Sequence, residues 1–308
     1  MLTRLFSHSK PIAFIISSIL LALAFIIENF FSSTIDLDSA LVFKQMGALL
    51  VLFLIVFALN FIVKRNRIHK THTYAVSSFI LIIIAFPEVL RSSGFLIAYL
   101  FLVLAIRRLI SLKSNTNLKQ KIFDASLLLS ISIWFEPFHW FFLPVIYFSV
   151  IMYASQNYRH FLIPLFGLSV GFIIHLCYFL VFKDSWLESS RLMFTWYGVD
   201  SFFDTFKYTT LLGLILFVLI WVIFKLPLIY SRAKLHVSES LSVILCFICL
   251  SIAVILFNNK PISEDAIYLV WPLSILLGNY FQLKRTKLWV KEMFYFLFIA
   301  GILFSAIY

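Results

Sequence analysis

The chain has 308 residues, of which 62% are hydrophobic and only 13% are charged, and its mean hydropathy is +1.02. Soluble domains are about half apolar and about a quarter charged, so a globule of this size cannot enclose so much apolar surface and must expose it to lipid. The composition therefore excludes a soluble protein. A net charge of +11 would suggest a nucleic-acid partner for a soluble chain, but in a membrane protein the distribution of the charge decides its meaning, and we expect no nucleic-acid partner here.

Apolar runs that are long enough to cross a bilayer recur along the whole chain. A spanning helix needs about 20 mostly apolar residues. We predict a single all-α, polytopic transmembrane domain over residues 1–308 with about eleven spans, at 11–31, 41–63, 73–90, 94–112, 122–135, 140–154, 161–182, 208–224, 241–257, 266–281 and 289–307. Pro137 divides the fifth and sixth segments, which are short, so this pair either crosses the membrane twice or forms a re-entrant hairpin.

The basic residues predict the orientation, because Lys and Arg are retained on the cytoplasmic side. With the N-terminus inside, nineteen of the 25 basic residues fall on the cytoplasmic face and six on the outer face. This order places the C-terminus outside. Eleven of the 14 acidic residues fall at or near the outer face, which the orientation rule does not require. Chemistry or recognition is therefore expected to face outward.

Two carboxylates, Asp36 and Asp38, stand in the short loop after the first candidate span, close to Glu28. Such a pair at a membrane surface can hold a divalent cation that bridges a lipid phosphate, or one member can take the proton from an acceptor hydroxyl. Two solvated loop acids with no further role are the alternative. Beyond that cation we expect no cofactor and no resident metal.

Glu88 and Arg91 close the third candidate span beside Pro87. A carboxylate inside a bilayer is costly unless it is paired or solvated, so Glu88 is expected at the boundary. Arg91 follows one helical turn later, where it can pair with Glu88 or contact a phosphate. A structural ion pair at a helix end and a ligand-binding site both fit this pattern.

Glu136, His139 and Trp140 bracket Pro137 in the next outer turn. A histidine beside a glutamate offers proton transfer or metal ligation, and an indole ring can stack on a sugar. The neighbouring aromatic residues also suit the belt that marks a membrane interface. The turn is thus either part of a substrate site or an interfacial anchor.

The longest outer segment, residues 183–207, mixes apolar and charged residues irregularly and then becomes rich in aromatic residues around Trp196. This pattern is typical of short amphipathic helices that lie in the membrane interface. We interpret the segment as a periplasmic lid over a cavity between the spans, with an inert connecting loop as the alternative.

The succession of spans from 73 to 182 resembles the central part of GT-C-type integral membrane glycosyltransferases. The likeness is carried by the Pro-Glu-Val-Leu-Arg turn at 87–91, the Ala-Ile-Arg-Arg-Leu-Ile end at 105–110, the proline-aromatic turn and the glycine-bearing span 161–182. The resemblance implies transfer of a sugar from a polyprenyl phosphate on the non-cytoplasmic side. It also implies a catalytic acid after the first span, where Asp36 and Asp38 stand, and donor contacts after the third, where Glu88 and Arg91 stand. The first outer loop of that family is long, whereas the corresponding loop of this chain, residues 29–41, is short. The whole chain also resembles an uncharacterised family of polytopic inner-membrane proteins from Bacteroidota, which implies a multi-pass protein of the bacterial inner (cytoplasmic) membrane.

The leading hypothesis is a GT-C-like protein, catalytic or degenerate, that handles a polyprenyl-phosphate-linked sugar at the periplasmic face. Asp36 or Asp38 would be the base or metal ligand, Arg91 a phosphate contact, and Trp140 and Trp196 the sugar or lid contacts. The alternative is a non-catalytic integral membrane subunit of a cell-envelope or secretion complex that docks membrane or periplasmic protein partners through its acidic, aromatic outer face.

Overall fold

A computed structural model describes residue 6 and residues 11–31, 39–68, 72–182, 206–233, 235–257, 262–283 and 286–307. Every regular element in these ranges is a helix, which confirms the predicted all-helical fold class. Three of the predicted site residues, Asp36, Asp38 and Trp196, lie outside the described residues, as does the predicted lid segment as far as residue 205.

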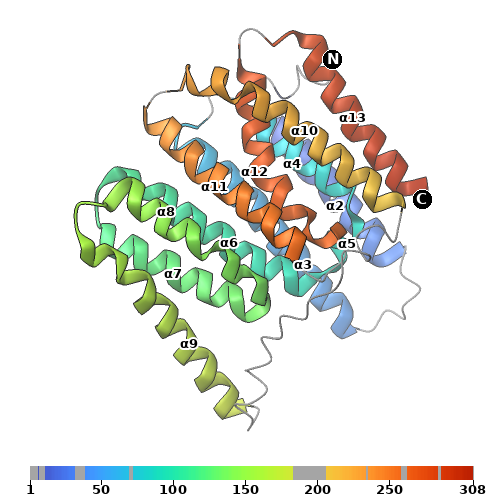
Figure 1. Cartoon of the computed structure of the whole chain (residues 1–308). Coiled ribbons are helices and arrows are strands. Elements are labelled where there is room, and N and C mark those ends of the chain that lie inside the picture. The colour runs from blue at the N-terminus through green and yellow to red at the C-terminus, as the bar shows by residue number, and fades with distance from the viewer. Residues whose placement is uncertain are drawn as a thin grey trace.

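Each of the eleven segments predicted from the sequence contains a helix (Figure 1). The elements in the described ranges are α2 (Pro11–Ile26), η1 (Ile27–Phe31), α3 (Ser39–Arg65), α4 (Tyr74–Ile84), α5 (Pro87–Arg91), α6 (Ser93–Ile110), η2 (Ser111–Ser114), α7 (Leu118–Phe135), η3 (Pro137–Phe142), α8 (Leu143–Ala154), η4 (Tyr158–Phe161), α9 (Ile163–Phe182), α10 (Phe206–Tyr230), α11 (Leu235–Phe257), α12 (Ile262–Gln282) and α13 (Leu288–Ile307).

Helix α12 forms the centre of the bundle. Residues 265–281 are buried without exception, and the helix packs against α4, α5, α10 and α11. Helix α4 is buried almost as completely. Because protein rather than lipid surrounds α12, its inner surface accommodates polar residues such as Ser274 and Asn279, both of which donate to backbone carbonyls within the helix.

Eight helices within the described ranges are long and apolar enough to cross a membrane. The three predicted segments outside this set contain α4, α7 and α12. Helix α4 has only 11 residues, α7 carries charges in its first two turns, and α12 carries Glu264 and Asp265 in its first turn and is less apolar than the eight helices. The membrane character of the chain is thus supported, whereas the number of spans and the orientation remain predictions.

The third predicted segment is broken into α4 and α5. Pro87 has no backbone N–H and its ring excludes a regular helix through the preceding turn, and Phe86 before it has φ −117° and ψ 79°. Helix α4 therefore ends at Ile84. Glu88 and Arg91 consequently belong to a separate short helix, α5, and not to the end of a long span.

Helix α9 lies at the edge of the bundle and extends away from it (Figure 1). Most of its side chains are exposed, and its principal contact is with α7. Gly167 faces Ser126 there, and Gly171 faces Ser130: a Cβ added at either glycine would lie 1.9 Å from the serine Oγ. Small residues on both helices therefore permit the backbones to approach closely, as in many membrane helix pairs.

His72 connects the chain just before α4 to the last residue of α12. Its Nε2 lies 3.2 Å from the Gln282 side-chain oxygen, which can only accept, so Nε2 carries the proton and donates. Burial lowers the pKa of His72 to about 4, and the positive charge of Lys291 acts in the same direction. His72 is therefore neutral at pH 7.

Candidate functional site

A buried group of polar side chains joins α7, η3 and α12. His139 on η3 is fully buried, and its two ring nitrogens contact Ser132 Oγ of α7 and, at 2.6 Å, the Tyr268 hydroxyl of α12. Ser132 Oγ donates to the Ala98 carbonyl at 2.7 Å, so it must accept from Nδ1–H of His139. In the neutral imidazole Nε2 then accepts from the Tyr268 hydroxyl.

Two hydrogen bonds hold the backbone of α12 beside His139. The Tyr99 hydroxyl donates to the Ile267 carbonyl at 3.2 Å, and Ser251 Oγ donates to the Tyr268 carbonyl at 3.0 Å. The Tyr268 ring packs edge-on against the Tyr99 and His139 rings. Four elements besides η3, namely α6, α7, α11 and α12, therefore hold His139 and Tyr268 in one arrangement.

Two carboxylates lie beside this group. Glu136 follows α7 in extended conformation and is 2% exposed, and Asp265 in the first turn of α12 is 1% exposed. Both lie within electrostatic range of the Tyr268 hydroxyl, and both have interaction partners. Trp140, by contrast, is 37% exposed on η3. The turn predicted from Glu136, His139 and Trp140 is thus buried on its polar side and open on its aromatic side.

A second polar group joins η1 to α5. Arg91 forms an ion pair with Glu28, whose side chain is largely buried while Arg91 is half-exposed. Asn29 Nδ2 donates to the Leu90 carbonyl at 3.2 Å and to the Phe25 carbonyl at 3.0 Å, which fixes the end of the first helix against α5. The Arg91 ion pair is therefore with Glu28, a residue that the sequence placed nearby without assigning it to the site.

The two groups lie at the same end of the bundle. Helix α5 packs against both η1 and α12, and α6 begins two residues after Arg91. Ala98, which accepts from Ser132, is five residues, or about 8 Å, along α6 from the start of that helix at Ser93. We call the residues Glu28, Glu88, Arg91, Glu136, His139, Trp140 and Asp265 the outer-end group, after the orientation that the sequence predicts.

The divalent cation predicted at Asp36 and Asp38 belongs to residues that the structure does not describe. Among the described residues, no set of three or more His, Cys, Asp and Glu side chains is arranged to hold a metal ion. Glu136 and His139, which the sequence also offers as metal ligands, are not joined by a third such ligand in the described part of the chain. The buried hydrogen bonds of His139 fit a positioning role.

Two residues of these polar groups, Glu28 and Tyr268, could not be predicted from the sequence. Glu28 ends an apolar span and resembles any acid at a helix end, so only the three-dimensional approach of η1 to α5 reveals its pairing with Arg91. Tyr268 stands in an apolar run of α12, far along the chain from His139. No local sequence pattern predicts a contact between residues separated by 129 positions.

These features define the class of the protein: a polytopic helical membrane protein with a partly buried polar group at one end of its helix bundle. The chain belongs to the Family of unknown function (DUF6427), whose family model matches residues 1–307. No curated protein and no solved structure matches the chain.

Proposed function

We propose that this protein handles a polyprenyl-phosphate-linked sugar at the outer, periplasmic face of the bacterial inner membrane. The observation that carries the proposal is the half-exposed ion pair of Arg91 with Glu28, at the same end of the bundle as Glu136 and Trp140. The likeness of residues 73–182 to GT-C-type enzymes supports the same substrate class.

Arg91 suits a lipid-linked phosphate. A guanidinium group binds phosphate through two parallel N–H donors, and half of the Arg91 side chain is open to such a ligand. Glu28 holds the guanidinium in place until a phosphate arrives. The exposed ring of Trp140 offers an apolar face against which a sugar can stack.

In the proposed reaction the oxygen of an acceptor hydroxyl attacks the anomeric carbon of the donor sugar. The bond between that carbon and the phosphate oxygen breaks, and its electron pair leaves with the polyprenyl phosphate, which Arg91 would stabilise. The proton of the acceptor passes to a carboxylate, for which Asp36 and Asp38 are our candidates. A divalent cation held by the same two residues would neutralise the leaving phosphate. His139 would position the turn that carries Trp140.

The second candidate is a non-catalytic integral membrane subunit of a cell-envelope complex. The burial of Glu136 and His139 favours it, because both are withdrawn from any substrate in the described structure. Under this proposal the outer face would dock a membrane or periplasmic protein, and Trp196 would contribute to that contact.

The experiment compares two ion pairs, one formed by Arg91 just before α6 and one formed by Arg108 in the last turn of α6. The purified protein is reconstituted in liposomes with polyprenyl-phosphate glucose, mannose or galactose, and bound donor and released polyprenyl phosphate are measured by mass spectrometry. Arg91→Gln should lower donor binding at least about tenfold, because it removes a charge-assisted hydrogen bond to the phosphate. Arg108→Gln breaks the pair between Arg108 and Asp124, whose atoms lie 3.1 Å apart, and should leave donor binding unchanged.

Donor binding that is unaffected by Arg91→Gln would overturn the proposed site. Binding without turnover, abolished by Arg91→Gln, would establish a degenerate, non-catalytic lipid-sugar binder. No donor binding by the unmodified protein, together with loss of a co-purifying partner in Trp196→Ala, would favour the docking subunit instead.

A further inference from the structure

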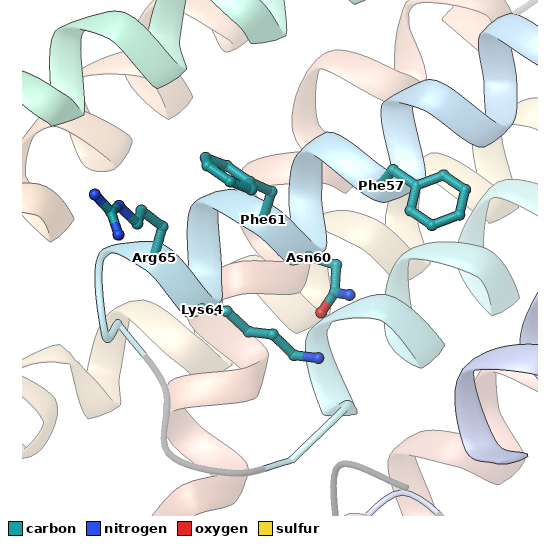
Figure 2. Close-up of a pocket in the computed structure, with 5 residues that line it drawn as sticks. All are labelled: Phe57, Asn60, Phe61, Lys64 and Arg65. Carbon is teal, nitrogen blue, oxygen red and sulfur yellow. The ribbon is translucent and has the colours of Figure 1, made fainter. Parts of the chain in front are cut away.

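A hollow of about 520 Å³ opens at the surface beside the last turns of α3. Its five lining residues are Phe57, Asn60, Phe61, Lys64 and Arg65 (Figure 2). Figure 2 shows Asn60 and Lys64 on one side of the helix and Phe61 and Arg65 on the other. The hollow is shallow and open, with a single helix as its lining, so it suits a headgroup that stays in contact with water rather than an enclosed small molecule.

The charges of the residues that line the hollow favour an anionic ligand. Lys64 and Arg65 are exposed, and none of the five lining residues is acidic. A third cation stands beside them, because the Arg107 guanidinium of α6 lies 4.3 Å from the centre of the Phe61 ring. This stacking fixes both side chains at the rim of the hollow. The guanidinium groups of Arg65 and Arg107, beside Phe61, are suitable donors for a phosphate, and the Lys64 ammonium adds positive charge from the other side of α3.

An exposed apolar stripe leads along α3 to this hollow. Its members recur every three or four residues, which places them on one face of the helix. They are Phe43, Met46, Leu50, Leu54, Phe57 and Phe61, each between 43% and 84% exposed. From first to last the stripe rises by about 27 Å, close to the thickness of a bilayer's hydrocarbon core. One acyl chain reaches only to the middle of the bilayer, about 15 Å, so a lipid whose chains lie along the part of the stripe from Leu50 to Phe61 would place its headgroup at the hollow.

We propose that the hollow binds the phosphate of an anionic glycerophospholipid whose acyl chains lie along the α3 stripe. The retention of Lys and Arg on the cytoplasmic side accounts for the basic residues at this end of α3. It does not require a hollow there, or the rings of Phe57 and Phe61 beside it. The site faces the cytoplasmic leaflet in the predicted orientation. Anionic lipids are drawn to basic residues at that surface.

The site is independent of the outer-end group. Lys113, just beyond α6, donates to the Asn66 carbonyl just beyond α3 at 3.0 Å, so the end of α3 lies at the end of α6 that is remote from Arg91. The lipid proposal can therefore fail while the proposed function stands, and the reverse also holds.

The test measures lipid retained by the purified full-length protein. The protein is placed in nanodiscs of phosphatidylcholine that contain a minor fraction of phosphatidylglycerol, extracted into mild detergent, and examined by native mass spectrometry. Lys64→Gln with Arg65→Gln should lower retained phosphatidylglycerol about 25-fold, because each of the two basic residues contributes about a factor of five to the binding of an anionic lipid near the surface. The matched control, Arg232→Gln with Lys287→Gln, removes two exposed basic residues from the same predicted face and should change retention less than twofold.

A second comparison separates a lipid from a free phosphate. Phe57→Ala with Phe61→Ala keeps Lys64 and Arg65 and should lower phosphatidylglycerol retention several-fold. Inorganic phosphate and glycerophosphate at millimolar concentration should not displace the lipid. Equal losses in the Lys64 and Arg65 variant and in the control would overturn the proposal, as would retention of phosphatidylcholine to the same extent as phosphatidylglycerol. Displacement by inorganic phosphate would overturn the lipid assignment.

Discussion

Replacing Gly171 by alanine should separate α9 from α7. An alanine Cβ at this position would lie 1.9 Å from Ser130 Oγ and 2.5 Å from Ser130 Cβ. A change of the serine side-chain torsion can move Oγ but cannot move Cβ. Since carbon atoms in contact lie about 3.5–4.0 Å apart, the two helix backbones must move apart by about 1 Å.

The expected destabilisation is about 1–3 kcal/mol, the usual cost of overpacking a tight contact. This is a large share of a typical unfolding free energy of about 5–15 kcal/mol. Helix α9 has few other places at which to recover the loss, because only Pro164, Gly167, Leu168 and Gly171 are buried along its 20 residues. The damage should therefore be concentrated in α9.

Replacing Ser130 by glycine should restore the stability that Gly171→Ala removes. Ser130→Gly removes both clashing atoms and leaves Ser130 Cα, at 3.8 Å, as the nearest remaining neighbour of the new methyl group. Ser130→Gly alone should cost about 1 kcal/mol through the lower helix propensity of glycine. The double variant Gly171→Ala with Ser130→Gly should be more stable than the sum of the single effects predicts, by about 1–3 kcal/mol.

The assay is equilibrium unfolding in mixed micelles at increasing dodecyl sulfate, with hydrogen exchange of α9 as the local measurement. Gly213→Ala serves as the control, because no atom lies within 4 Å of the added Cβ, and it should not destabilise the protein. The reasoning is refuted if Gly171→Ala is as stable as the unmodified protein, or if Ser130→Gly fails to restore stability to it.

Three further predictions concern the pH dependence, the buried polar group and the orientation. As the pH falls from about 6.5 towards 4, the unfolded chain protonates His72 while the folded chain does not, so the unfolding free energy should drop by about 2 kcal/mol between about pH 7.5 and about pH 4.5. His72→Asn should remove that part of the pH dependence in chemical unfolding, and an unchanged slope would contradict the assignment. Tyr268→Phe removes the hydroxyl that donates to buried His139 and should lower the unfolding free energy by about 1–3 kcal/mol in the same assay, a neutral effect arguing against the hydrogen bond. An impermeant maleimide added to intact cells should label Ser39→Cys and not Ser114→Cys, whereas the reverse pattern would invert the predicted orientation.

The sequence predicts the helices well because the signal is local. An apolar run of sufficient length can be recognised within a single segment, and all eleven predicted segments contain helices. The break before Pro87 shows the limit of hydropathy alone, because the residues on both sides are apolar and only the missing N–H divides α4 from α5. The apolar run at 266–281 predicts a span, but it does not show that protein rather than lipid surrounds α12.

The outer-end group is less predictable because its contacts join distant segments. The turns at Glu88 and Glu136 can be recognised from their positions at span ends, and the structure places them at one end of the bundle. Their partners cannot be recognised in this way. Arg91 has an acid three residues before it in the chain, yet its ion pair is with Glu28, because η1 packs against α5.

The enclosure of α12 has a consequence for assembly in the membrane. Chains are inserted from the N-terminus, so α4 enters long before the helix that buries it. Helix α4 is about 17 Å long, little more than half of a hydrocarbon core, and its principal neighbour is α12. Until α12 emerges from the ribosome, α4 therefore lacks its principal neighbour and has only the earlier helices, α2 and α3 among them, to pack against. The arrival of α12 fills the centre of the bundle before α13 packs against α4 and α10, and it brings Tyr268 and the hydrogen bond to His139.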